Sequence, residues 1–142
     1  MGYTRYYEVY QKIDESEFEK FSQDCKTICD EVTKQFGHGL ADWDGEGDPE
    51  FTPTEVRFNG VGDDAHETFG IGLDTYGFQF TKTNRKPYDR HVLACLVLAK
   101  IYFGDKIRVS SDGDNNDSVI ESLIKEFSRD KKINLILDDV RK

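Results

Sequence analysis

The sequence predicts a single α+β domain, residues 1–142, in which a single layer of about three helices packs on a mainly antiparallel sheet. Three observations predict it: the length of the chain, its composition, and the order of its strand and helix patterns. A chain of 142 residues is long enough to bury one core without disulfides or metals. Hydrophobic residues make up 37% and aromatic residues 13% of the chain, which favours a folded protein although 33% of the residues are charged.

The first third of the chain is predicted to form a strand, a long helix and a loop. Residues 3–11 are rich in aromatic and β-branched side chains, which is typical of a strand. Capping-box patterns at residues 14–17 and 16–19 precede apolar residues spaced by three and four, so an amphipathic helix is expected as far as Gly37. Residues 37–54 are rich in Gly, Pro and Asp and are expected to form a long loop.

Three short strands are predicted next, over residues 55–59, 67–73 and 78–83. Turn signals separate these strands, so we expect them to form an antiparallel meander. The helix that follows begins at Pro87 and has apolar residues on nearly every side, which predicts that it is buried across a face of the sheet.

The last third of the chain repeats the pattern of a strand and a helix. Residues 107–110 are typical of a strand, and a helix is expected from about Asp117, with a capping box at residues 118–121. Residues 133–140 fit either an alternating strand or a last turn or two of helix, and we favour the strand.

Composition narrows the classes of function. A formal net charge of −9 repels nucleic acid and anionic membranes at long range, so direct nucleic-acid binding is not expected. The acidity is explained either by solubility or by an acidic surface that binds a basic protein. The longest apolar run, residues 92–103, is too short to span a bilayer. An N-terminus without an apolar segment and an odd number of cysteines predict a protein of the cytoplasm.

The segment Lys82–Asp89 is the most informative, because three cations precede the proline that opens the buried helix. Proline in the first turn loses no hydrogen bond, and the free amides there add positive partial charge. We expect Lys82, Arg85 and Lys86 to hold a phosphate or carboxylate, with Tyr88 as a stacking or hydrogen-bonding surface. The alternative is that the cations pair with nearby carboxylates. No P-loop or dinucleotide fingerprint accompanies the segment.

An acidic loop is the second candidate for function. Its carboxylates alternate along the chain, and oxygen donors in such a pattern are those that calcium prefers. The spacing fails the helix-loop-helix calcium motif, because the twelfth position is Pro53 where that motif has glutamate, so no metal is expected. We expect a solvated loop with Trp43 folded back on the domain. A second hypothesis for the function of the protein is that the carboxylates of this loop contact a basic partner protein. These carboxylates are Asp42, Asp44, Glu46 and Asp48.

Two carboxylates are candidates for acid-base chemistry. Asp112 follows a predicted strand directly, and Glu67 lies next to His66. Three scattered histidines without a Cys-x-x-Cys motif do not predict a zinc site, and no cofactor is expected. Cys25 and Cys29 lie on the apolar side of the first helix and are expected in the core. Whether the protein is an enzyme stays open at this point.

Several segments together resemble a family of uncharacterised small proteins encoded by bacteriophages, other viruses and some cellular genomes. The resemblance covers most of the chain, and the family has histidine at the position of Arg5. The segments that carry it are Met1–Tyr7, Val56–Gly60, Glu67–Phe69, Phe80–Thr83, Arg85–Asp89 and Ser111–Gly113.

This resemblance implies a shared site and, through its viral members, favours an antagonist of host defence. It places one set of residues around a single polar pocket: Asn59, Glu67, Lys82, Thr83, Arg85, Tyr88, Asp89 and Asp112. The sequence therefore leaves two hypotheses for the function. One is a protein that binds a phosphorylated small molecule or nucleotide at the basic segment, with Glu67 or Asp112 as hydrogen-bond acceptor or general base. The other is a non-enzymatic protein whose acidic surface blocks a basic site on a partner.

Overall fold

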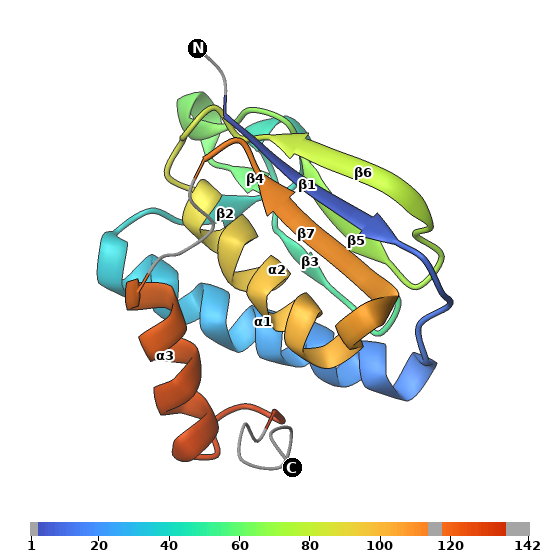
Figure 1. Ribbon diagram of the computed structural model, residues 1–142. Coiled ribbons are helices and arrows are strands. Elements are labelled where there is room, and N and C mark those ends of the chain that lie inside the picture. Colours follow the sequence, from blue (N-terminus) through green and yellow to red (C-terminus); the bar gives the residue numbers. More distant parts are fainter. Residues whose placement is uncertain (1–2, 114–117, 136–142) are drawn as a thin grey trace.

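The computed structural model describes residues 3–113 and 118–135. Its helices and antiparallel strands confirm the α+β fold that the sequence predicts (Figure 1). The helices of the described part are α1 (Glu15–Phe36), α2 (Asp89–Phe103) and α3 (Ser118–Arg129).

The first strand is the centre of a three-stranded antiparallel sheet. In this sheet β1 (Thr4–Val9) lies between β6 (Gly77–Lys82) and β7 (Ile107–Ser111). The register places Tyr6 opposite Phe80 on one side and Ser110 on the other. Side chains alternate along β1 between a buried and a more exposed face, as expected of a sheet that is covered on one side only.

A second group of strands surrounds β4 (Glu55–Gly60). Along one edge β4 pairs with β5 (Phe69–Gly72), and along the other it pairs with β2 (Leu40–Ala41) and β3 (Glu50–Phe51). The sequence predicted only a loop here and was wrong about β2 and β3. Strands of two residues are too short to carry an alternating pattern, so only the partner strand reveals them.

The predicted meander is corrected at its last strand, because β6 pairs with β1 and forms no strand pairing with β5. Side chains satisfy backbone groups of β5 that a hairpin partner would otherwise bond. The Gly72 amide donates to Thr75 Oγ1 at 2.8 Å, and the Tyr7 hydroxyl donates to the Gly70 carbonyl at 2.5 Å. Strand β1 offers β6 a longer partner than β5 does, since β1 and β6 pair over six residue pairs and β5 has only four residues.

Helix α1 follows its sequence signals closely. Asp14 caps it by accepting a hydrogen bond from the Glu17 amide at 3.1 Å, and Gly37 ends it with a φ of 80°, as its C-cap position requires. The apolar stripe that the spacing predicted is buried in the core: Phe18, Phe21, Cys25, Ile28 and Val32.

Helix α2 is buried on nearly every side, as predicted, and packs along α1 beneath the sheet (Figure 1). It begins at Asp89, two residues after the predicted start at Pro87. The amide groups of Asp89 and Arg90 donate to the carbonyls of Lys86 and Pro87, so a turn precedes the helix. Cys95 in α2 lies near Cys29 of α1, with 3.7 Å between the sulfur atoms, and burial raises the pKa of both thiols.

The chain after α3 is held by a buried carboxylate. Asp24 of α1 accepts hydrogen bonds from the Asn134 amide at 2.7 Å, the Leu135 amide at 3.0 Å and the Tyr102 hydroxyl at 2.6 Å. Residues 133–135 have no strand pairing, and residues 136–140 of the predicted strand lie outside the described residues. Asp24 therefore joins α1, α2 and the segment that follows α3.

No helix in the described part of the chain is both long and apolar enough to cross a bilayer.

Candidate functional site

Residues from four distant segments meet where β1 begins, β6 and β7 end, and α2 starts (Figure 1). We call this group the polar cluster. Its members are Arg5, Glu67, Lys82, Thr83, Arg85, Lys86, Tyr88, Asp89 and Asp112. A buried frame and a set of exposed charged groups make it up.

The centre of the frame is an ion pair between Arg5 and Asp89. Arg5 Nε donates to Asp89 Oδ1 at 3.0 Å and Nη2 donates to Oδ2 at 2.8 Å, a two-pronged geometry. Thr83 Oγ1 donates to the same carboxylate at 2.6 Å. Because Asp89 is the first residue of α2, it supplies negative charge at the helix N-terminus itself. Asp89 and Thr83 therefore serve the fold more than a ligand.

Glu67 connects the end of β6 to the start of α2 through two hydrogen bonds. Its Oε1 accepts the Lys82 amide at 2.6 Å, and its carbonyl accepts the Tyr88 hydroxyl at 2.5 Å. The Tyr88 ring is 1% exposed, and burial raises the pKa of its hydroxyl. The expectation that Tyr88 offers a stacking surface to a ligand is therefore wrong, because the ring is part of the core.

The three cations of the segment Lys82–Asp89 are not part of the buried frame. Lys82, Arg85 and Lys86 form no ion pair with any described carboxylate. The Arg85 guanidinium lies over the Tyr3 ring, with Cζ 4.3 Å from the ring centroid, and the edge of its planar fork can still donate. The alternative expectation, that these cations pair with nearby carboxylates, therefore finds no support in the described residues.

Asp112 lies at the end of β7 and bonds to β1. Its Oδ2 accepts the Thr4 amide at 3.0 Å and its Oδ1 accepts the Tyr6 hydroxyl at 2.7 Å, which raises the pKa of Tyr6. Thr4 is opposite Lys82 in the sheet, so Lys82 and Asp112 flank it on the two neighbouring strands. Both oxygens of this candidate base are thus engaged, as is one oxygen of Glu67.

Asn59 does not line the same surface. It is 1% exposed, and its amide makes four hydrogen bonds, two as donor to His66 O and Thr68 Oγ1 and two as acceptor from the amides of Gly60 and His66. This is the full capacity of an asparagine side chain. Asn59 therefore holds the loop after β4 in place, and its expected role in ligand binding is not supported by its position.

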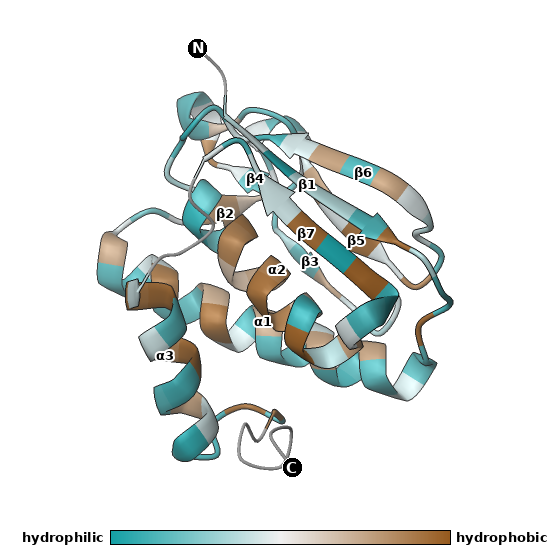
Figure 2. Ribbon diagram, viewed as in Figure 1, coloured by the Kyte–Doolittle hydropathy of each residue, from teal (hydrophilic) through white to brown (hydrophobic). Residues whose placement is uncertain are grey.

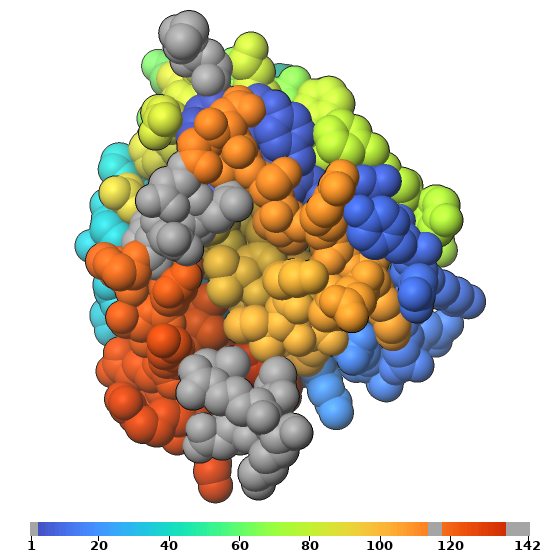
Figure 3. Space-filling view, in the orientation of Figure 1, coloured from blue at the N-terminus to red at the C-terminus, as the bar shows by residue number. Residues whose placement is uncertain are grey.

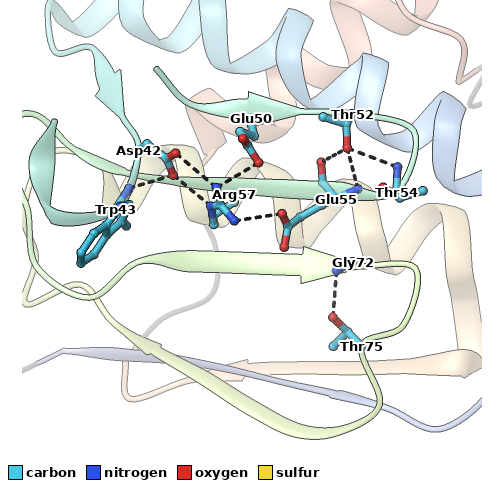
Figure 4. A network of polar contacts seen from close by, with 9 residues as sticks. All are labelled: Asp42, Trp43, Glu50, Thr52, Thr54, Glu55, Arg57, Gly72 and Thr75. Atoms are coloured by element: carbon cyan, nitrogen blue, oxygen red, sulfur yellow. Dashed lines mark hydrogen bonds and ion pairs between the residues drawn. The ribbon is translucent and has the colours of Figure 1, made fainter. Parts of the chain in front are cut away.

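The acidic loop folds around an arginine that the sequence reasoning missed. Arg57 of β4 forms ion pairs with Asp42 at 2.9 Å, Glu50 at 3.0 Å and Glu55 at 3.1 Å (Figure 4). The guanidinium lowers the pKa of Asp42. Asp42 is thus held in an ion pair within the domain. Three other carboxylates of the loop are exposed: Asp44, Glu46 and Asp48.

Trp43 is 66% exposed, and the expectation that it folds back on the domain is wrong. The Trp43 amide donates to Asp42 Oδ1 at 2.8 Å, and Asp44 has a φ of 66°, so a tight turn forms around the tryptophan. In Figure 4 the indole ring extends away from the ion-pair network.

The histidines form no metal site in the described part of the chain, where no group of metal-ligating side chains is found. His91 is buried in α2 beside Thr33, with 3.0 Å between Nε2 and Oγ1, and burial lowers its pKa to about 4. No hydrogen bond joins the side chains of His66 and Glu67 among the described residues, so the expected acid-base pair is not assembled.

Arg5 and Arg57 are the residues that the sequence analysis should have found. Arg5 occupies an inward position of β1 between Tyr3 and Tyr7, which are both buried. An arginine in phase with buried residues needs a charged partner, so the alternation itself was a usable signal. Arg57 is partly buried in β4. The pairing of β3 with β4 brings Glu50 next to it, and this pairing could not be predicted from the sequence.

Comparisons of this chain with models of protein families, with curated proteins and with solved structures find no match. The fold and the site define a small α+β protein with a polar cluster at one end of its sheet, partly buried and partly exposed. Membership of the phage and virus family stays a prediction from the motifs.

Proposed function

We propose that the protein binds a phosphorylated small molecule or nucleotide at Lys82, Arg85 and Lys86. One observation carries the proposal: these three cations lie within five residues, and none pairs with a described carboxylate in a chain with 28 acidic residues. The Arg5–Asp89 pair and the Tyr88 anchor hold the turn that presents them. Glu67 and Asp112 supply hydrogen-bond acceptors nearby for ligand hydroxyl groups.

The proposal is for binding and includes no reaction. A general base needs a carboxylate that is free to take a proton from a substrate. Glu67 Oε1 already accepts the Lys82 amide, and both oxygens of Asp112 accept hydrogen bonds from β1. These oxygens are therefore already occupied by hydrogen bonds within the protein.

The test replaces Arg85 with alanine and screens nucleotides and sugar phosphates by thermal shift and calorimetry. A ligand that raises the wild-type Tm should not raise that of the variant, because each lost charge-assisted contact costs about 1.5 to 3 kcal/mol of binding. This corresponds to a loss of roughly 10-fold to 150-fold in affinity. The Tm without ligand should hardly change, since exposed cations add little stability.

Two further variants make this test specific. Arg85→Lys keeps the charge but removes the planar fork, so it should recover only part of the affinity. Arg129→Ala removes an arginine of α3 whose side chain is 74% exposed and should leave binding unchanged. If no member of the panel raises the wild-type Tm, the proposal is rejected.

A second candidate function is supported by the acidic loop. Exposed tryptophans are frequent anchors of protein interfaces, and Trp43 is followed in the acidic loop by the exposed carboxylates Asp44, Glu46 and Asp48. Such a surface is complementary to a basic site on a partner protein. The resemblance to virus-encoded proteins makes a host defence protein one such partner.

The acidic loop is tested by cross-linking in cell extracts, followed by quantitative mass spectrometry. A basic protein captured by the wild type should be lost with Trp43→Ala, with the triple change Asp44→Lys, Glu46→Lys and Asp48→Lys, and at high salt. The triple change Glu121→Lys, Glu126→Lys and Asp130→Lys shifts the net charge equally but elsewhere, and should preserve capture. Equal capture by both triple variants would rule out a role of the loop.

A further inference from the structure

The outer face of the three-stranded sheet carries a group of exposed aromatic rings. Even-numbered residues of β1 and β6 point to this face, and they include Tyr6, Phe78 and Phe80. Phe78 and Phe80 are both 56% exposed. The rings contact one another, with centroids 5.9 Å apart for Tyr6 and Phe78 and 6.2 Å apart for Phe78 and Phe80. We call these three residues the aromatic face.

The helices cover only the opposite face of this sheet. Tyr7 and Val9, the inward neighbours on β1, are buried in the core with α2. Figure 2 colours two segments of β6 as hydrophobic, and Figure 3 shows β7, β1 and β6 side by side at the surface. An apolar surface on adjacent strands is unlike the scattered exposed residues of an ordinary surface, and such patches mark interaction sites.

A cation continues the row of aromatic side chains. Lys82 follows Phe80 by two residues on β6, so it belongs to the same face, at about 7 Å along the strand. Its side chain pairs with no described carboxylate, and the turn that contains Arg85 follows directly. The aromatic face therefore ends at Lys82, one of the cations of the polar cluster.

We propose that this face binds single-stranded nucleic acid. Unpaired bases stack on Phe78, Phe80 and Tyr6, while Lys82 and Arg85 contact the phosphates at one end. Aromatic side chains on adjacent strands of an open sheet are an established platform for unpaired bases, because every base has a π face. The proposal rests on the proposed function, since it uses the same cations to hold phosphate.

The net charge of −9 led the sequence analysis to expect no direct contact with nucleic acid. On the outer face itself the charges of the described strands balance. Arg108 forms an ion pair with Glu8 at 2.9 Å. Lys82 and Asp112, which lie on opposite sides of Thr4 without forming an ion pair, carry one charge of each sign. Binding therefore depends on stacking more than on charge, and a duplex, whose bases are hidden, should not bind.

The test measures fluorescence anisotropy of labelled eight-nucleotide oligouridylate and oligothymidylate, with a duplex of equal length as control. Phe80→Ala and Phe78→Ala should each weaken single-strand binding by roughly fivefold to 150-fold, the range for one lost stacking partner. Phe80→Leu keeps an apolar side chain and should still lose affinity. Val119→Ala shortens a side chain of α3 that is 46% exposed and lies outside the sheet, and should have no effect.

The salt dependence of binding tests the small number of phosphate contacts. With two phosphates held, the slope of log K against log salt should be about −1.4, from about −0.7 per phosphate of a single strand. Arg85→Ala should make this slope smaller. Circular dichroism of each variant confirms that the fold is retained, which is expected because the replaced rings are exposed.

Three results would overturn the inference: no binding of either oligonucleotide, equal binding of the duplex, or binding unchanged by both phenylalanine variants. A dimer in sedimentation that Phe78→Ala dissociates would show that a second copy covers this face, and would also overturn it. If uridine monophosphate binds in an Arg85-dependent way while the oligonucleotides do not, the inference fails and the proposed function stands. If the oligonucleotides do not bind and no member of the panel of nucleotides and sugar phosphates raises the wild-type Tm, both fail.

Discussion

Replacing Arg5 with alanine is expected to lower the free energy of unfolding by about 3 to 5 kcal/mol. The side chain of Arg5 is only 6% exposed and that of Asp89 only 17% exposed, so the variant leaves a carboxylate largely buried without its counter-charge. The loss should be measured by chemical denaturation at neutral pH. It is among the largest expected effects because two charge-assisted hydrogen bonds disappear together.

Two controls separate the buried charge from the contact itself. The double variant Arg5→Met with Asp89→Leu removes both charges and should be less destabilised than Arg5→Ala, because no uncompensated charge remains. Arg85→Ala removes an exposed arginine of the same cluster and should change stability by less than about 1 kcal/mol. A loss of under about 1 kcal/mol for Arg5→Ala would show that solvent reaches Asp89 and that the frame is not closed.

Replacing Leu96 with alanine is expected to cost about 2 to 5 kcal/mol. Leu96 is fully buried in α2, and truncation removes buried apolar surface and leaves a cavity that the core cannot fill completely. Chemical denaturation of the two proteins measures the difference.

The matched control for Leu96 is Val119→Ala on α3, where the side chain is 46% exposed. This change should stay within about 0.5 kcal/mol, as is usual for surface substitutions. A cost of less than about 1 kcal/mol for Leu96→Ala would show that α2 is peripheral to the core.

The helices were predictable because their signals are local. The cap at Asp14, the αL residue Gly37 and the apolar stripe between them all lie within one stretch of chain, and each acts through bonds to residues three or four positions away. The start of α2 was misplaced by two residues because the turn before it also accepts proline.

Strand pairing was predicted less well, because a strand sequence does not specify its partner. The patterns of β5 and β6 suggested a hairpin, yet β6 pairs with β1, more than 60 residues away in the chain. The choice depends on the side chains that satisfy the edge of β5, Tyr7 and Thr75, and on the length of the register that β1 provides. Only packing in three dimensions compares these alternatives.

The candidate site, too, could be predicted only in part from the sequence. The sequence by itself identified the basic segment, since charge, proline and spacing are all local there. Which residues of this segment are buried and which face solvent depends on how the chain folds around it. In the fold, the Tyr88 hydroxyl donates to the Glu67 carbonyl, and internal hydrogen bonds use the full capacity of the Asn59 amide.

The α+β class, the helices and the basic turn could be predicted from the sequence, because they depend on periodicity, caps and charge within short stretches of chain. Three features form only in the folded chain: the Arg5–Asp89 pair, the ion pairs of Arg57 and the aromatic face of β1 and β6. Each of these joins residues from separate strands or from a strand and a helix. Their energies depend on burial and distance, and both are set only when the whole chain has folded.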